Sequence, residues 1–314
     1  MSMLKDPTRF GKVAVVMGGN AAERDISLLS GGAVLQALQD QGVDAIEFDS
    51  KSQPLEQLRE LAVDRVFNMV HGRGGEDGLL QGALELAGIP YTGSGVLGSA
   101  LGMDKLHTKL CWLGAGIPTP AWMVLKGDDD VKHCAEKLGF PLMVKPALEG
   151  SSLGMAKAVN LQQLHQAYIN AATFGCDVIA EQWVQGAEYT VAILEGKALP
   201  MIRLETPNSF YDYAAKYQAN TTQYHCPCGL TVEQEEQIQA LALNAFNVLG
   251  GSAWGRVDLM IDANNHPQFL EINTVPGMTT HSLVPMAAKQ AGINFKELAW
   301  RILESSIMTR KERK

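Results

Sequence analysis

The sequence has no long apolar run, no apolar core in its first residues and no surplus of basic residues. No stretch approaches the roughly 20 consecutive apolar residues of a membrane-spanning helix, and residues 1–12 lack the apolar core of a signal peptide. We therefore expect a soluble protein that stays in the cytoplasm. The 26 basic and 34 acidic side chains give a formal net charge of −8, which disfavours nucleic acid or an anionic membrane surface as the main partner.

The sequence also has few cysteines and no paired-cysteine motif. Its five cysteines are an odd number without CxxC spacing, which favours free thiols in a reducing compartment. Cys226 and Cys228 flank a proline, but two thiolates are too few for a structural zinc site, which needs four ligands. The motif GxxxxGK[ST] is missing as well, which excludes a P-loop enzyme.

Glycine is the residue that is over-represented. The chain has 31 glycines in 314 residues, against a typical share of about 7%. With 46% apolar and 19% charged residues, the composition is that of a globular protein with one large domain or two to three smaller ones. The glycines do not follow the collagen period, so we expect many in tight turns where the backbone closely approaches another group.

The first hundred residues alternate strands and helices. Strands are expected at 13–17, 45–48 and 66–70, and helices at 26–38 and 78–86. Hydrophobic strands separated by helices indicate a parallel sheet covered on both faces. Glycine-rich loops follow the first and third strands, and such sheets bind ligands beyond the carboxyl ends of their strands. The expected fold class is therefore α/β, beginning with a Rossmann-like parallel sheet in residues 1–100.

The rest of the chain divides into two further parts. A helix is expected at 96–115, where Gly114, Gly116 and Pro118 stop it. We expect one domain over residues 101–185 and another over 186–314. Within the second, residues 206–227 show no clear period, and a loop this long in a compact protein is usually functional or disordered. On this pattern alone it is either a functional lid or disordered, and the family resemblance given below implies a lid loop.

Residues 93–98 match the pattern GxGxxG before a helix. A dinucleotide site also needs a βαβ unit and an acidic residue about 20 positions later, at the end of the next strand. Here the helix continues through Asp104 and Lys105 to a Gly/Pro break, so the dinucleotide interpretation is not favoured.

A stronger signal begins at Lys145, which ends an apolar strand. An ammonium group in such a place is costly unless it meets an anion. The loop that follows holds Gly150, Ser151, Ser152 and Gly154, whose N–H and hydroxyl groups can surround phosphate oxygens. A surface lysine before a hairpin is the alternative for this segment alone.

A second constellation lies in the predicted hairpin near the C-terminus. Glu271 and Asn273 share one strand face by the period of two, and Asp258 lies on the partner strand. Two carboxylates and an amide supply hard oxygen ligands, which suit Mg²⁺ bridging phosphates rather than Zn²⁺. A solvated surface is the alternative here. Taken together, the two constellations indicate a nucleotide site.

The whole set of motifs resembles the D-alanine–D-alanine ligase family of the ATP-grasp superfamily. The matching segments occur in the family's order between residues 12 and 306. They are GGNAAERDIS (18–27), HGRGGEDG (71–78), MDK (103–105), KPALEGSS (145–152), YDYAAKY (211–217), WGRVD (254–258) and EINTVPGMT (271–279). The resemblance implies an ATP-grasp fold after the parallel-sheet domain. It also implies ATP-dependent ligation of two D-alanines through a D-alanyl phosphate, for peptidoglycan precursors.

The resemblance implies roles for individual residues. ATP phosphates would meet Lys105, Lys145 and the Ser152 loop, while Glu181 and the Val184 backbone would meet adenine and Glu188 the ribose. Two Mg²⁺ ions, or Mn²⁺ in their place, would bind the hairpin set Asp258, Glu271 and Asn273. The family also implies a cytoplasmic homodimer.

The same resemblance implies a substrate site. Glu23 would bind the ammonium group of the first D-alanine, with Ser151 and Tyr217 hydrogen-bonded nearby. Arg256 and the Gly277 N–H would form an oxyanion hole. The remaining substrate residues would be His71, Lys216, Ser282 and Leu283, of which Ser282 and the Leu283 N–H would take the second carboxylate at a helix N-terminus.

Two alternatives stay open at this point. One is a related ATP-grasp ligase that joins D-lactate or D-serine as second substrate, although Lys216-Tyr217 speaks against D-lactate. The other is a non-catalytic nucleotide-binding regulator, which the oxyanion donor Arg256 disfavours because a pure binding protein does not need one.

Overall fold

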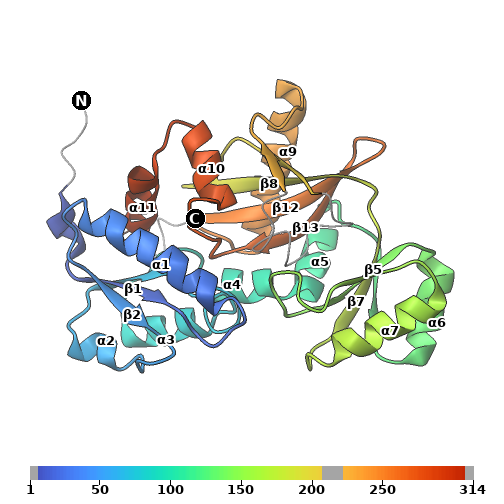
Figure 1. The fold of residues 1–314 in the computed structure, drawn as a ribbon, viewed down its shortest axis with the longest axis horizontal. Helices are drawn as coiled ribbons and strands as arrows, with labels where there is room; N and C mark the ends of the chain where they lie inside the picture. The colour runs from blue at the N-terminus through green and yellow to red at the C-terminus, as the bar shows by residue number, and fades with distance from the viewer. Residues whose placement is uncertain (1–5, 207–221, 308–314) are drawn as a thin grey trace.

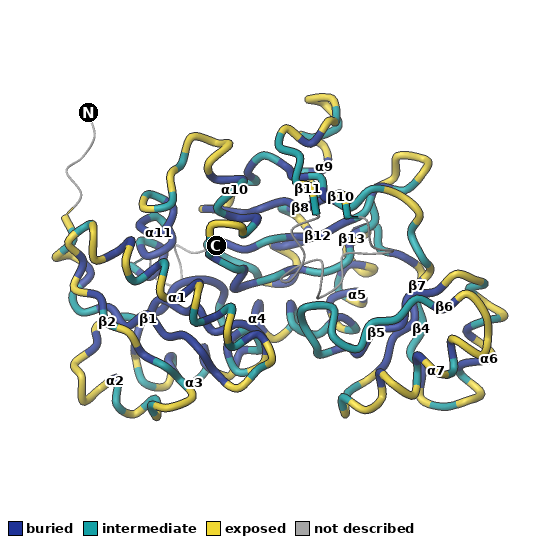
Figure 2. The backbone as a smooth tube through the Cα atoms, in the orientation of Figure 1, coloured by how far each residue is buried: buried dark blue, intermediate teal, exposed yellow. Residues whose placement is uncertain are grey.

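The computed structural model describes residues 6–206 and 222–307, which form three sheets. Along the chain they are the N-terminal, middle and C-terminal sheets, and in space the C-terminal sheet lies between the other two (Figure 1). Buried residues are concentrated in the strands, whereas the helices α6 and α7 carry many exposed residues (Figure 2).

The N-terminal sheet is parallel, with strand order β2-β1-β3. The central strand β1 is wholly apolar and all five of its residues are buried, as expected for the middle of a parallel sheet covered on both faces. Its elements are η1 (Pro7–Phe10), β1 (Val13–Met17), α1 (Arg24–Gln39), β2 (Ala45–Asp49), α2 (Gln57–Glu60), β3 (Arg65–Asn68) and α3 (Leu79–Ala87). The predicted parallel sheet is confirmed.

The prediction of one continuous helix over residues 96–115 is wrong. The structure has α4 (Val96–Met103) and α5 (Lys105–Gly114), separated by Asp104 in an extended conformation. The Asp104 carboxylate accepts a hydrogen bond from the His107 N–H and so caps α5. Apolar spacing runs through both helices, so the pattern did not reveal the break. Its consequence is that Lys105 stands at the start of a new helix.

The middle sheet is antiparallel, with strand order β4-β7-β5-β6. Helices α6 and α7 pack against each other and against this sheet (Figure 1). The elements are β4 (Trp122–Leu125), α6 (Asp128–Leu138), β5 (Leu142–Pro146), β6 (Ala156–Ala158), α7 (Leu161–Ala172) and β7 (Val178–Gln182).

The C-terminal sheet is antiparallel, with strand order β11-β10-β8-β12-β13, and β9 pairs with β8. Alternate residues of β8 enter different cores: Val191 and Ile193 pack with α5 and α9, while Ala192 and Leu194 pack with α1, α10 and α11. The elements are β8 (Gly186–Leu194), β9 (Lys197–Ala198), β10 (Ile202–Glu205), β11 (Gln223–His225), α9 (Val232–Val248), β12 (Trp254–Asp262), β13 (Pro267–Asn273), α10 (Leu283–Gln290) and α11 (Phe295–Glu304).

Most of the predicted lid lies outside the described residues. Of the expected segment 206–227, the described part includes β11, which pairs with β10. Over residues 6–206 and 222–307, no helix is both long enough and apolar enough to cross a membrane.

Candidate active site

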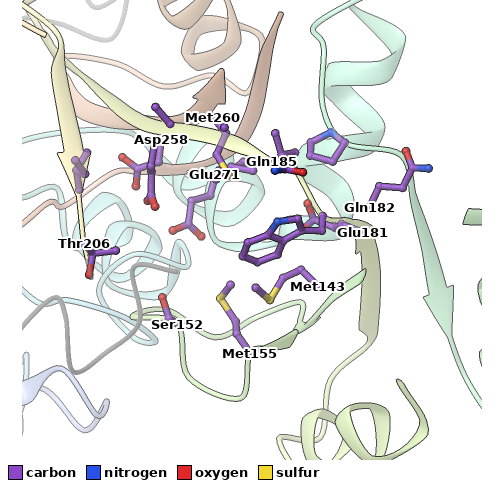
Figure 3. Close-up of a pocket in the computed structure, with 18 of the residues that line it drawn as sticks. Met143, Ser152, Met155, Glu181, Gln182, Gln185, Thr206, Asp258, Met260 and Glu271 are labelled. Atoms are coloured by element: carbon purple, nitrogen blue, oxygen red, sulfur yellow. The ribbon is translucent and has the colours of Figure 1, made fainter. Parts of the chain in front are cut away.

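Two cavities of about 450 and about 490 Å³ meet at Glu271, which lines both. The first lies between the middle sheet and the C-terminal sheet, and the second lies between the N-terminal region and the C-terminal sheet. Figure 3 shows the first cavity, with Asp258 and Glu271 on one side and Met143 and Met155 on another. A ligand that spans both cavities would pass the Glu271 carboxylate.

The first cavity combines an apolar wall, which includes one flat indole ring, with charged groups. Its apolar wall includes Met143, Met155, Met260 and Trp183. The Lys157 ammonium lies 3.8 Å from the centre of the Trp183 ring, a cation–π contact that holds the indole in place. Such a slot suits an aromatic base, because base stacking needs a flat apolar surface.

Charged groups gather on one face of the antiparallel strands β5 and β7. Glu181 lies between two lysines: Lys145 Nζ is 2.6 Å from its Oε1 and Lys109 Nζ is 3.1 Å from its Oε2. Burial alone would raise the pKa of Glu181, but the two ammonium groups outweigh burial and lower it. Glu181 is therefore an anion, and the cluster as a whole carries a net positive charge.

The loop after β5 has an unusual backbone. Ser151 and Ser152 both have positive φ angles, of 50° and 59°, which non-glycine residues rarely adopt and which occur mostly at functional sites. Ser152 lines the first cavity and Ser151 the second. The loop thus lies across the junction of the cavities, as a phosphate-binding loop would.

Glu23 and this loop are in close contact. A methyl group on Gly150 would lie 2.5 Å from Glu23 Oε1, so the carboxylate rests directly on the loop backbone. Glu23 is 6% exposed and lines the second cavity. Its buried carboxyl group is placed where it can meet a small cation such as an amino acid's ammonium group.

Strands β12 and β13 place the hairpin residues together. Asp258 pairs with Glu271 and Arg256 with Asn273 across the two strands. The Arg256 guanidinium donates to both Asp258 oxygens, at 2.8 and 2.6 Å, and Asn273 donates to Asp258 Oδ2 at 3.1 Å. The bidentate pair fixes the direction of Arg256, which lines the second cavity.

The hairpin residues fit a hard divalent cation by their chemistry. No cluster of three or more His, Cys, Asp or Glu side chains suited to a metal occurs in the described ranges. Two carboxylates and an amide are nevertheless what Mg²⁺ needs when phosphates and water complete its shell. Lys105 Nζ is 3.3 Å from Glu271 Oε2, so a phosphate bound there would meet a cation beside the acidic pair.

A hydrogen-bond network holds the loop that contains Gly277. His71 Nδ1 is 2.8 Å from the Val275 carbonyl oxygen, and its Nε2 is 3.3 Å from Ser30 Oγ. Ser30 Oγ accepts from the Met278 N–H. A carbonyl can only accept, so Nδ1 carries the proton and Nε2 accepts from the serine hydroxyl. Burial lowers the pKa of His71 to about 4, consistent with this neutral form.

Glu76 fixes the same loop from the other side. Its Oε2 accepts from the Gly72 N–H at 2.6 Å and its Oε1 from the Val275 N–H at 3.1 Å. Burial raises its pKa to about 7. The Gly277 loop is therefore attached to the N-terminal region through Ser30, His71 and Glu76.

The structure brings together the described site residues that the sequence predicts. In the first cavity lie Lys145, Ser152, Glu181, Val184, Glu188, Asp258 and Glu271. In the second lie Glu23, His71, Ser151, Arg256, Glu271, Asn273, Gly277, Ser282 and Leu283. Lys105 joins them through Glu271. Lys216 and Tyr217 lie outside the described residues.

Sequence reasoning missed Lys109, Glu76 and Ser30. Lys109 stands four residues after Lys105, one helical turn along the same face, and that spacing was a usable signal. Glu76 lies inside a quoted motif but received no role. Ser30 gave no signal, because a serine in a helix has many ordinary uses.

Comparison with known proteins agrees with this arrangement. Residues 46–94 match the family "D-ala D-ala ligase N-terminus" and residues 111–304 match "D-ala D-ala ligase C-terminus". The D-alanine--D-alanine ligase of Methylococcus capsulatus is 58% identical over 96% of this chain and 98% of its own. The chain belongs to the D-alanine–D-alanine ligase family.

Solved structures of the family have the same fold. The D-alanine--D-alanine ligase of Bacillus anthracis superposes with a TM-score of 0.85 at 34% identity, over 96% of this chain and 99% of that one. Its complex with ATP gives 0.83 at 31%, with the same coverage of both chains. The VanG D-Ala:D-Ser ligase of Enterococcus faecalis gives 0.82 at 29%, over 94% and 99%. The expected ATP-grasp fold after a parallel-sheet domain is confirmed.

Proposed function

We propose that this chain joins two D-alanines to D-alanyl-D-alanine with ATP, for peptidoglycan precursors. The observation that carries the proposal is the meeting of two cavities at Glu271. One cavity has the apolar slot and lysines that suit a nucleotide, and the other has the anion and donors that suit amino acids.

ATP occupies the first cavity in this proposal. Its base lies against Trp183 and Met260 and meets Glu181 and the Val184 backbone, while Glu188 meets the ribose. Lys105, Lys145 and the Ser152 loop neutralise the phosphates. Phosphoryl transfer depends mainly on positioning and charge neutralisation, which these groups supply.

Asp258, Glu271 and Asn273 would hold Mg²⁺, which would offset the phosphate charge and so make the terminal phosphorus easier to attack. Mn²⁺ offers the same hard-ligand chemistry. The family resemblance motivates two such ions, and the donor set described above agrees with hard cations.

The first chemical step takes place beside Glu23. Glu23 binds the ammonium group of the first D-alanine and so directs the substrate's carboxylate toward Glu271 and the terminal phosphate, and the family resemblance assigns Ser151 and Tyr217 hydrogen bonds to this step. A carboxylate oxygen attacks that phosphorus, the bond to ADP breaks, and D-alanyl phosphate forms. Holding both reactants in one geometry removes much of the entropic barrier.

The second step joins the two amino acids. Ser282 and the Leu283 N–H, at the start of α10, bind the carboxylate of the second D-alanine, and His71 and Lys216 complete the substrate contacts. The second amine attacks the acyl carbon. Arg256 and the Gly277 N–H stabilise the oxyanion, and inorganic phosphate leaves with the oxygen that came from the first carboxylate.

The family resemblance also implies a cytoplasmic homodimer, which we retain as part of the proposal. Light scattering of the purified protein during size-exclusion chromatography measures its mass directly. A mass of one chain at the assay concentration contradicts the dimer.

The experiment measures phosphate release with purified protein, ATP and Mg²⁺, and identifies the product by mass spectrometry. Phosphate release should require D-alanine and should be accompanied by formation of the dipeptide. L-alanine should not substitute for D-alanine. Competition among D-alanine, D-serine and D-lactate tests whether the second substrate is one of the latter two. If most of the product contains D-serine or D-lactate, the D-alanine assignment is refuted. ATP binding without any turnover supports a regulator instead.

A further inference from the structure

Lys109 is a wholly buried lysine behind the wall of the first cavity. Its relative exposure is 0%. Its Nζ lies 3.1 Å from Glu181 Oε2 and donates a hydrogen bond of 2.6 Å to Thr119 Oγ1. Well-packed apolar side chains often replace buried ion pairs without loss of stability, so stability alone gives no reason for an ammonium group here.

Thr119 is oriented to receive this lysine. Its hydroxyl donates to the Phe269 carbonyl oxygen at 2.9 Å, so a lone pair of Oγ1 points to the Lys109 ammonium. Because Lys109 belongs to α5, Glu181 to β7 and Phe269 to β13, this chain of contacts connects the two sheets that enclose the first cavity. These contacts therefore fix the position of Glu181 relative to both walls of the cavity.

The two lysines hold different oxygens of Glu181. Lys145 lines the cavity and stands next to Oε1, whereas Lys109 lies behind the wall and holds Oε2. Oε1 is buried and, among the described residues, receives no well-aligned hydrogen bond, because its contact with Lys145 is an ion pair without hydrogen-bond geometry. Because Oε1 is covered by that ammonium group, a ligand reaches it only after Lys145 has turned toward bound phosphates.

We propose that Lys109 is a positioning residue that determines which purine base the site accepts. By holding Oε2 behind the wall, it leaves Oε1 to accept from the amino group of adenine once Lys145 has turned to the phosphates. A base with a carbonyl oxygen at that place meets the carboxylate with repulsion. The inference rests on the proposed function and extends it to a residue that does not touch the nucleotide.

Loss of the Lys109 charge has a second effect. With one cation left, the Glu181 carboxylate turns fully to Lys145, and the local charge falls from net positive to neutral. Lys145 is then withdrawn from the phosphates. Both affinity and base selection should therefore weaken together.

The test is Lys109→Met, with calorimetric binding of ADP and IDP, which carries a carbonyl oxygen in place of the adenine amino group. We expect about tenfold weaker ADP binding and an about tenfold smaller preference for ADP over IDP, since a site built to accept from a donor rejects ligands without it. In turnover, KM for ATP should rise while KM for D-alanine stays within about twofold.

Matched variants separate this role from a structural one. Lys109→Arg keeps the charge and should restore most of the preference, and Lys132→Met makes the same change on the exposed face of α6 and should leave it unchanged. A folded Lys109→Met protein with lower thermal stability but an unchanged ADP/IDP ratio overturns the proposal. If that variant does not fold, Thr119→Val should reduce the ratio in the same direction, and an unchanged ratio there overturns it.

The outcomes also separate this inference from the proposed function. ADP and IDP binding needs no turnover, so a wild type that selects ADP but does not release phosphate with D-alanine refutes the ligase activity alone. A wild type that binds both nucleotides equally overturns the role of Lys109.

Discussion

Glu271 Oε2 lies 3.3 Å from Lys105 Nζ at the point where the two cavities meet. The ammonium group also donates to the Glu149 carbonyl oxygen at 2.6 Å, so Lys105 connects the loop after β5 to strand β13. A carboxylate and a lysine in contact at this junction can face a phosphate together, the one through a divalent cation and the other directly.

Glu271→Gln should remove turnover while preserving the fold. The change keeps the shape of the side chain but removes the charge that would hold a cation, and we expect kcat to fall by at least about 100-fold. Steady-state kinetics at rising Mg²⁺ concentrations, with circular dichroism of the folded protein, measure this. Glu236→Gln, the same change on exposed α9, is the control, and near-normal activity of Glu271→Gln removes the metal assignment.

Arg256→Lys should impair the second chemical step. Lysine keeps the positive charge but cannot form the bidentate hydrogen bond with Asp258 that orients the Arg256 guanidinium. We expect kcat to fall by about 10²–10³-fold with ADP affinity nearly unchanged. Arg59→Lys on the exposed surface is the matched control. Equal losses of ADP affinity and kcat would place Arg256 in nucleotide binding instead.

Gly277→Ala should disturb the substrate cavity. An added methyl group would lie 2.9 Å from Ser282 Oγ, which forces apart the two groups assigned to the oxyanion and the second carboxylate. We expect KM for D-alanine to rise by at least about tenfold, because small misplacements at a reacting centre are costly. Gly32→Ala, where nothing lies within 4 Å of the added methyl, should retain normal kinetics. Unchanged KM for Gly277→Ala would contradict the assignment of Gly277.

The neutral state of His71 makes folding stability depend on pH. Burial lowers its pKa to about 4, from 6.5 for an exposed histidine, so the unfolded chain binds the proton more readily. The stabilisation that neutral His71 contributes is complete above its pKa in the unfolded chain. It is lost as the pH falls from there toward about 4, the pKa in the folded protein. Denaturant unfolding of wild type and His71→Gln should show the difference in free energy of unfolding shrinking by about 2 kcal/mol between about pH 7 and about pH 5. A difference that does not change with pH shows that His71 does not titrate this way.

The sequence predicted much of the site because its chemistry lies in short segments. Lys145 with its loop and the Asp258–Glu271–Asn273 hairpin could each be found from residue type and spacing. Contacts between segments far apart in the sequence could not be found in this way. The pairing of Lys109 with Glu181 and the attachment of Val275 to His71 join residues 72 and 204 positions apart, which no local pattern contains.

The break between α4 and α5 shows the same limit on the scale of the fold. Apolar spacing continues across Asp104, and the local sign of the break is a carboxylate that caps the next helix. An aspartate inside a helix and an aspartate at its N-cap look alike in sequence. The domain limits near residues 100 and 185 stay predictions.

The most direct test of the account follows oxygen atoms from D-alanine. With oxygen-18 in the D-alanine carboxylate, the proposed D-alanyl phosphate transfers one labelled oxygen to each phosphate released, and mass spectrometry of the phosphate detects it. The account predicts a single oxygen-18 in every phosphate, together with labelled D-alanyl-D-alanine. Phosphate without label would contradict it.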